Sequence, residues 1–414
     1  MKKLLFLLCT LGVMAACSSD DDESGSGFVP QPSERTVIVY MAGENNLTAY
    51  VNTNLREMKE GSRQLSPSSC LLVYVDKSKN SELPWLARIR DGQVTDSVSL
   101  HDMGISDKDE YASDPYVMER VLQYAVSRYP ASDYGLVLWG HSTGWVVTTD
   151  SIAYTRAYGV DNGLNSVYKV EGMWLNVPTL ARVLAKLPHW KFIFADCCNF
   201  MCLETLYELR SVTDYVIGSP VEIPQEGAPY QTLTPAMFDR SNFATLMVDR
   251  YYEQKIGGLD LPLTAVKMSE MEQLARATRT AVQAVKTRQT TEYADLKDLI
   301  YYYYGSARFY YDQINNIFYD AGDFLRAKAP EADYQQWKTA LDKAIVKKTF
   351  SAKWKTDKKW DKFYGNNFTV TPERQHGVSM YIPQSPADKD NKATSHADYS
   401  RDIRKFAWWY AVWQ

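Results

Sequence analysis

Short apolar runs alternate with amphipathic segments along the first two thirds of the chain. Residues 36–41 form a β-branched run that ends at the turn 43–46, after which Leu47, Val51 and Leu55 recur at helical spacing. The same order of strand, turn and helix then repeats. We expect further strands at 70–75, 134–139, 190–195 and 214–219, and helices around 118–125, 177–187 and 201–210. Strands that alternate with helices predict an α/β fold with a mostly parallel central sheet and helices on both faces.

The pattern changes in the last third of the chain. Longer helical segments follow, including 268–286 and 334–348. A short apolar run at 377–383 predicts a late strand that rejoins the sheet. We therefore expect a core at 35–267 and a helical C-terminal extension at 268–414.

The N-terminus has the pattern of an export signal. Lys2 and Lys3 precede an apolar run at 4–16 that is too short to span a bilayer. Small residues stand directly before Cys17, and an acidic tract follows it, as in bacterial lipoproteins. We expect a signal peptide at 1–16, a lipid on Cys17 and a flexible linker at 17–34. The alternative is an ordinary secretory signal with an incidental cysteine.

This N-terminus predicts where the protein is located and what it contacts. The lipid would anchor it to the membrane, as an outer-membrane lipoprotein of the bacterial cell envelope, and the acidic tract resembles a surface-export signal. The formal net charge is −4, and no run of five Lys or Arg occurs. We therefore expect no nucleic acid partner.

The cysteines beyond the leader are few and clustered. Three of the four lie within six residues, and no C-x-x-C pair is present; the four are Cys70, Cys197, Cys198 and Cys202. A disulfide framework would be spread along the chain, and a zinc site would need paired ligands. The cluster therefore indicates either thiol chemistry or burial.

His141 and Cys198 each follow the end of an expected strand. In open α/β sheets the carboxyl ends of the strands carry the ligand site. A thiol with a pKa of about 8.5 needs a nearby base to react at neutral pH. Cys198 could also be a small core residue. The remaining histidines fall at loops or element ends and are expected to be surface or structural residues: His101, His189, His376 and His396.

Several blocks resemble the clostripain family of cysteine peptidases. Residues 134–145, YGLVLWGHSTGW, resemble its histidine block, and 194–209, FADCCNFMCLETLYEL, resemble its cysteine block. Further blocks at 37–47, 215–230, 319–325 and 377–383 resemble other segments of the family, and all the blocks occur along the chain in the order in which the family has them. The resemblance covers most of 36–385 and is weakest through the helical extension. It implies a caspase-like fold and a cysteine endopeptidase that acts on polypeptide substrates.

The resemblance also implies roles for individual residues. Cys198 would attack the scissile carbonyl, with His141 as base or acid, and the backbone N–H groups of Ser142 and Cys198 would bind the oxyanion. Relatives usually have glycine where this chain has Ser142. Asp196 and Glu226 would form the S1 pocket and select Arg or Lys. Otherwise Asp196 caps a turn and Glu226 is a solvated loop charge.

Relatives of this kind also cleave themselves between the two blocks. Arg156 is the candidate processing site, with Lys169 as the alternative. Some relatives depend on calcium, but no contiguous EF-hand loop occurs here. The sequence therefore leaves open whether the protein binds a metal ion, with calcium as the candidate. The competing interpretation is a catalytically silent, caspase-like lipoprotein that binds peptide or glycan in an aromatic cleft.

Overall fold

The computed structural model describes most of the chain after the leader and linker. The described residues are 32–78, 82–146, 158–163, 173–255, 260–286, 296, 298–302, 317–352, 354, 369–383 and 402–414. Pro32–Gln414 form one compact unit. Cys17, Arg156, Lys169 and His396 lie outside the described residues.

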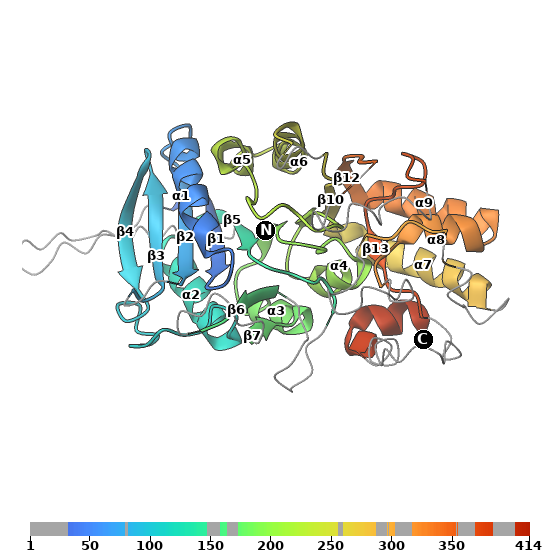
Figure 1. Cartoon of the computed structure of the whole chain (residues 1–414), viewed down its shortest axis with the longest axis horizontal. Coiled ribbons are helices and arrows are strands. Elements are labelled where there is room, and N and C mark those ends of the chain that lie inside the picture. The colour runs from blue at the N-terminus through green and yellow to red at the C-terminus, as the bar shows by residue number, and fades with distance from the viewer. Residues whose placement is uncertain are drawn as a thin grey trace, which may run out of the picture. The chain divides into compact units, whose positions relative to one another are not determined.

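A nine-stranded mixed sheet forms the centre of this unit (Figure 1). Its five middle strands are parallel, in the order β9 (Tyr215–Gly218), β8 (Trp190–Asp196), β5 (Ala131–Trp139), β1 (Ser33–Gly43) and β2 (Ser69–Lys77). Antiparallel strands complete both sides: β3 (Trp85–Arg90) and β4 (Gln93–Ser99) beside β2, and β10 (Thr264–Lys267) and β12 (Ile345–Lys348) beside β9. The five parallel strands are those that the sequence predicts.

Burial explains why the middle strands are continuous apolar runs. Residues 37–42 of β1 are all fully buried, because helices cover both faces of the sheet at this point. The edge strand β4 is exposed along 93–97, and its sequence is correspondingly polar.

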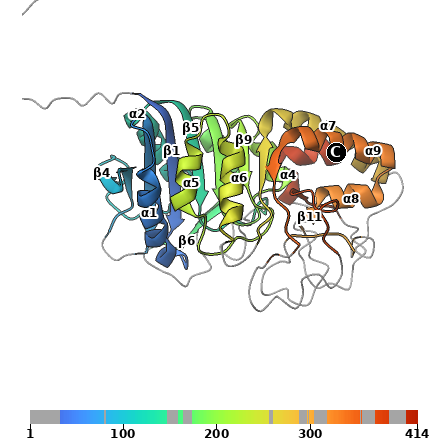
Figure 2. The ribbon, with the colours of Figure 1, turned by 90° about the horizontal axis from the view of Figure 1, so that it is seen from above.

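Two groups of helices cover the two faces (Figures 1 and 2). One face carries α1 (Thr48–Ser62), α5 (Tyr230–Met237) and α6 (Phe243–Glu253), and the other carries α2 (Pro115–Arg128), α3 (Val177–Leu184) and α4 (Leu203–Leu209). The start of α2 is fixed by Asp114, whose carboxylate accepts hydrogen bonds from the N–H groups of Tyr116 and Val117.

The C-terminal part contributes helices and one edge strand. A 3₁₀ turn (Met268–Glu270) leads into α7 (Met271–Lys286), followed later by α8 (Ala321–Lys328), α9 (Glu331–Ala344) and the terminal turns Ile403–Lys405 and Trp409–Trp413. The helix expected at 334–348 ends at Ala344, and the chain continues as β12.

The late strand does not join the central sheet, so that expectation is wrong. β13 (Ser379–Met380) pairs with β11 (Tyr319–Asp320) in a separate two-stranded sheet, because β12 already occupies the edge beside β10. The N–H of Ser379 still donates to the carbonyl of Met201 (3.0 Å), which links β13 to the loop after β8. A further two-stranded sheet joins β6 (Tyr158–Asp161) and β7 (Met173–Leu175).

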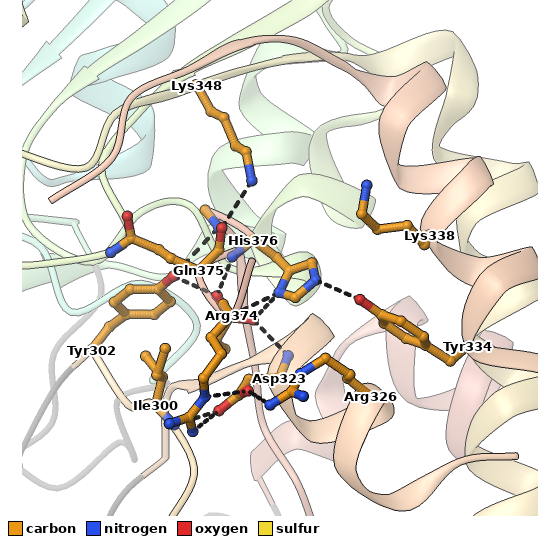
Figure 3. A network of polar contacts seen from close by, with 12 residues as sticks. Ile300, Tyr302, Asp323, Arg326, Tyr334, Lys338, Lys348, Arg374, Gln375 and His376 are labelled. Carbon is orange, nitrogen blue, oxygen red and sulfur yellow. Dashed lines mark hydrogen bonds and ion pairs between the residues drawn. The ribbon is translucent and has the colours of Figure 1, made fainter. Parts of the chain in front are cut away.

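A buried hydrogen-bond network holds the β13 segment against α8 and α9 (Figure 3). Nδ1 of His376 lies 2.9 Å from the carboxylate of Asp320, and Nε2 lies 3.1 Å from the hydroxyl of Tyr334. Nearby, Arg374 forms an ion pair with Asp323 at 2.5 Å. His376 is therefore a structural histidine, as expected.

Candidate active site

The carboxyl ends of β5 and β8 carry the two residues that the sequence singles out. These strands are adjacent and parallel, and Trp139 pairs in register with Asp196. His141 and Cys198 each follow this pair by two residues, so both leave the sheet at the same edge. The N–H of Gly140 donates to the carbonyl of Asp196 (3.3 Å), which joins the segments that follow β5 and β8 just past the strand ends.

The loops after β5 and β8 also pack directly on each other. Gly144 has a φ of +60°, and a Cβ at this position would collide with the carbonyl oxygen of Asn199 and lie 3.2 Å from Sγ of Cys202. Only glycine combines this backbone angle with so close an approach. The contact fixes the histidine loop relative to the cysteine loop.

His141 is oriented by the turn after β1. Its Nε2 lies 2.6 Å from Oδ1 of Asn46, and its carbonyl accepts a hydrogen bond from the N–H of Gly159 (2.8 Å). The ring also lies beside that of Trp174, with centroids 6.5 Å apart. Since an amide oxygen only accepts, Nε2 carries a proton in this arrangement, and Nδ1 is the basic nitrogen of the neutral ring.

Cys198 is the most accessible thiol among the described residues. All four described cysteines are free, and Cys198 is half-buried whereas Cys70, Cys197 and Cys202 are buried. Its Sγ accepts a hydrogen bond from the N–H of Ile223 (3.4 Å). Burial, together with the charge of Glu222, raises the pKa of the Cys198 thiol to about 12. In this conformation the thiol is protonated at neutral pH, so the reaction needs a base to remove its proton.

Two backbone N–H groups at this edge are available for an oxyanion. Within the part of the chain that the structure describes, the N–H groups of Ser142 and Cys198 donate to no other residue. Ser142 has no positive φ, so replacing the usual glycine imposes no left-handed backbone here. Asn199, directly after Cys198, does have a positive φ of 54°, which asparagine tolerates better than most residues.

The pentapeptide Gly140–Gly144 also matches the Gly-x-Ser-x-Gly pattern of serine hydrolases. The structure does not fit that interpretation, because no helix begins within 140–146 and the Ser142 backbone lacks the strained angle of a nucleophile elbow. The Ser142 hydroxyl is buried and accepts a hydrogen bond from the N–H of Gly144 (3.0 Å). Ser142 therefore shapes the loop.

Asp196 is a buried carboxylate beside the cysteine loop. Its Oδ2 accepts hydrogen bonds from the N–H of Ala228 (3.0 Å) and the hydroxyl of Tyr230 (2.8 Å), whereas Oδ1 is buried without a partner. The hydroxyl of Tyr251 is also buried, beside this carboxylate, and its interaction with Asp196 lowers the pKa of the carboxyl. Burial raises the pKa of Asp196 to about 6 despite the two hydrogen bonds. The site is thus a buried carboxylate surrounded by the hydroxyl groups of Tyr230 and Tyr251.

Glu226 lies in the turn that covers Asp196. Gly227 has a φ of +72°, and a Cβ there would lie 3.0 Å from Oδ2 of Asp196. The carbonyl of Glu226 accepts a hydrogen bond from Asn54 (3.0 Å), and its side chain is exposed. A substrate side chain can reach Asp196, which is 2% exposed, only when this turn moves.

Sequence reasoning missed several residues that shape this edge. Asn46 orients His141, Glu222 acts on Cys198, and the charge of Glu57 acts on Asp196. The Asn-rich turn that ends the first strand was a visible signal for Asn46. Glu57 gave no such signal, because it is one of several charges on an amphipathic helix.

A cluster of acidic residues adjoins this edge and is the one place among the described residues where side chains could together hold a metal ion. Glu44, Asp76 and Asp161 each offer an oxygen within 4.8 Å of the others. A surface groove of about 750 Å³ lies elsewhere, between α1 and the β3–β4 hairpin, with Arg56, Lys59 and Glu82 in its wall. Because it contains none of the residues at the carboxyl edge, we assign it no role in the site.

A cysteine and a histidine at adjacent parallel strand ends, on a sheet of this topology, are the arrangement expected of a cysteine protease with a caspase-like fold. The family comparison places the chain within that class. The sequence model of the clostripain family (peptidase C11) matches residues 39–412, and the chain belongs to this family. The comparison with curated proteins returned no match.

Two solved structures resemble the chain over most of its length. One is a secreted C11 cysteine protease from Bacteroides thetaiotaomicron in complex with an irreversible peptide inhibitor; it is 26% identical, with a TM-score of 0.70, and the match covers 92% of this chain and 98% of that one. The other is an inactive zymogen C11 protease from Parabacteroides distasonis, 26% identical with a TM-score of 0.71, and the match covers 93% of this chain and 100% of that one.

None of the helices in the described part of the chain has the length and apolar character that crossing a bilayer requires.

Proposed function

We propose that this cysteine protease is an endopeptidase that cleaves after Arg or Lys through a Cys198–His141 dyad. Cys198 attacks the scissile carbonyl after His141 removes the thiol proton, and His141 then protonates the leaving amine. The N–H groups of Ser142 and Cys198 bind the oxyanion. The observation that carries the proposal is the register of β5 and β8, from which both side chains emerge at one edge.

The preference for a basic P1 side chain rests on Asp196. Its unpartnered Oδ1, with the charge of Glu57 nearby, offers charge-assisted hydrogen bonds to a guanidinium or ammonium group. Glu226, exposed on the covering turn, adds a second negative charge at the entrance to the pocket. Entry of the P1 side chain displaces the turn.

We propose further that the chain is made as an inactive form and cleaves itself after Arg156, with Lys169 as the alternative position. The similarity to a zymogen relative supports this, as does the burial of Asp196 beneath the neighbouring turn. The N-terminus is processed before Cys17, and a lipid on Cys17 anchors the protein in the bacterial cell envelope. Retention of a Cys17→Ala variant in the membrane fraction would contradict the anchor.

The test of the dyad is hydrolysis of fluorogenic peptides that carry Arg, Lys, Ala or Asp at P1. Wild type should cleave the Arg and Lys peptides, and both Cys198→Ala and His141→Ala should lose at least about 1,000-fold in kcat/KM. Cys197→Ala is the matched control, because it removes the adjacent buried thiol, and it should keep most of the activity. Wild type should also yield a fragment that begins at Ala157, absent from Cys198→Ala.

Two results would overturn the assignment. Activity that survives in Cys198→Ala but not in Cys197→Ala would move the nucleophile to the neighbouring thiol. A folded wild type that cleaves no peptide, before or after exposure to trypsin, would favour the silent binding protein.

A further inference from the structure

A partly exposed tryptophan lies beside the proposed catalytic histidine. The ring of Trp174, on β7, has its centroid 6.5 Å from that of His141, with an interplanar angle of 45°. Both side chains are partly exposed, so neither ring is sealed inside the core. A large aromatic ring that keeps part of its surface in solvent next to a reactive group offers apolar contact area to a ligand.

The backbone around Trp174 fixes its position relative to the histidine loop. Leu175, the next residue, is 2% exposed and pairs with Tyr158 of β6. Tyr158 in turn forms an antiparallel bridge with Ser142, which directly follows His141. A continuous ladder of backbone pairing therefore joins the two rings, and the tryptophan is in place before a substrate binds.

Trp174 and the proposed P1 pocket lie towards opposite faces of the central sheet. Asp196 accepts a hydrogen bond from the hydroxyl of Tyr230 (2.8 Å), which begins α5. β7 leads directly into α3, and Figure 1 shows β6, β7 and α3 together on the side opposite α5 and α6. A peptide whose P1 side chain faces Asp196 therefore reaches Trp174 by continuing past the dyad.

The chemistry of the dyad determines which residue of the peptide lies there. In the proposed mechanism His141 protonates the leaving amine, and this nitrogen belongs to P1′, the residue directly after the scissile bond. We propose that the ring of Trp174 forms a wall of the S1′ subsite, so that the protease prefers an apolar side chain at P1′. This inference rests on the proposed function, because the direction of the peptide follows from the roles of His141 and Asp196.

The alternative is that Trp174 only supports the ring of His141. The two roles differ in a quantity that can be measured. Loss of a support slows the cleavage of every peptide by the same factor. Loss of a subsite wall changes the ratio of kcat/KM between peptides that differ only at P1′.

The test is competition between two peptides in one reaction. Both carry Arg at P1, and they differ only in Leu or Asn at P1′, which are similar in shape but not in polarity. Because both peptides meet the same enzyme, the ratio of their kcat/KM values does not depend on how much of it is active. We expect wild type to favour the Leu peptide at least about 10-fold, and Trp174→Ala to reduce this preference to about 2-fold or less.

Two further variants serve as controls. Trp174→Phe keeps an aromatic wall and should retain most of the preference for Leu. Trp85→Ala removes another partly exposed tryptophan, on β3, and should leave the ratio unchanged.

Either of two results would overturn the subsite. One is an unchanged ratio in Trp174→Ala, even with a lower overall rate, which would leave the ring as a support for His141. The other is a wild type that does not distinguish Leu from Asn at P1′. Failure of the P1 assignment appears elsewhere, since peptides with Ala at P1 would then be cleaved as fast as those with Arg, whatever the P1′ ratio.

A wild type that cleaves no peptide would overturn the proposed function, and binding would then decide the role of Trp174. The same two peptides, labelled with a fluorophore, are titrated by anisotropy against Cys198→Ala. Binding of the Leu peptide that is at least about 5-fold tighter, and that loses this advantage when Trp174→Ala is added, would support an apolar wall. Equal Kd values for the two peptides would overturn it.

Discussion

Asp196 shows at the scale of one residue how its proposed function and the stability of the protein oppose each other. Its folded pKa of about 6 lies above the roughly 3.9 of an unfolded aspartate, so the folded state binds the proton more tightly. Stability contributed by this group is therefore present below about pH 4 and is lost as the pH rises through 6. An ionised carboxylate in this place suits a cationic substrate and destabilises the free protein.

We expect Asp196→Asn to separate the two effects. The amide keeps an acceptor for Ala228 and Tyr230 and removes the buried charge, so the variant should be more stable at pH 7.5 by up to about 3 kcal/mol. The gain should shrink towards zero at pH 4, which thermal unfolding from pH 4 to 8 would measure. Cleavage after Arg should fall about 100-fold at neutral pH. A variant that is less stable than wild type at pH 7.5 would contradict the argument that the buried, ionised carboxylate destabilises the folded protein.

The sequence predicted some of these residues and missed others for a clear reason. His141 and Cys198 follow apolar strands, so the α/β pattern alone places both at one edge. Asn46 contacts His141 and Glu222 acts on Cys198, and in each case the two residues lie on different loops. Such contacts depend on strand register and loop packing, which a local stretch of sequence does not show. Asp196 was singled out because it matches an S1 position of the clostripain family, but its burial came only from the structure.

At the scale of elements, the active edge depends on how the loops after β5 and β8 fit together. Gly144 allows the histidine loop to approach the carbonyl of Asn199. Because the loops carry His141 and Cys198, a displacement of either changes the geometry of the pair.

We therefore expect Gly144→Ala to lower activity beyond its effect on folding. The methyl group both strains a positive φ and collides with Asn199, so it should cost more than about 1 kcal/mol and reduce kcat/KM at least about 100-fold. Gly104→Ala is the matched control, since its φ is +68° and nothing lies within 4 Å of an added Cβ. It should show only the backbone strain, with normal activity. Equal kinetics in the two variants would rule out the loop contact as a determinant.

Burial on both faces decides which strands can be recognised from the sequence. The five parallel strands are continuous apolar runs because both of their faces are buried. β4 is polar and exposed, and β10 and β12 are four-residue strands, so none of these stands out. Residues 345–348 continue the pattern of α9 and become a strand only because β10 offers an edge, which is a tertiary effect.

At the scale of the whole molecule, the C-terminal part packs against the loop that carries His141. Trp145, at the end of the histidine loop, is fully buried against the rings of Phe318, Tyr381 and Phe406, with centroids 6.0, 5.0 and 6.5 Å away. β12 adds the outermost strand to the central sheet. These contacts support the proposal that residues 268–414 are an extension of the core and fold with it.

Phe406→Ala tests this dependence. The ring is fully buried, so its removal should cost about 3–5 kcal/mol and, for a unit of this size, lower Tm by about 4–6 °C. If the core and the extension fold as one unit, calorimetry should show a single transition that shifts as a whole, and the loss of support behind Trp145 should reduce peptidase activity as well. Tyr410→Ala, at a side chain that is 56% exposed, should change neither. Two transitions, with only one of them shifted by Phe406→Ala, would instead show that the extension folds independently and that the catalytic edge does not need it.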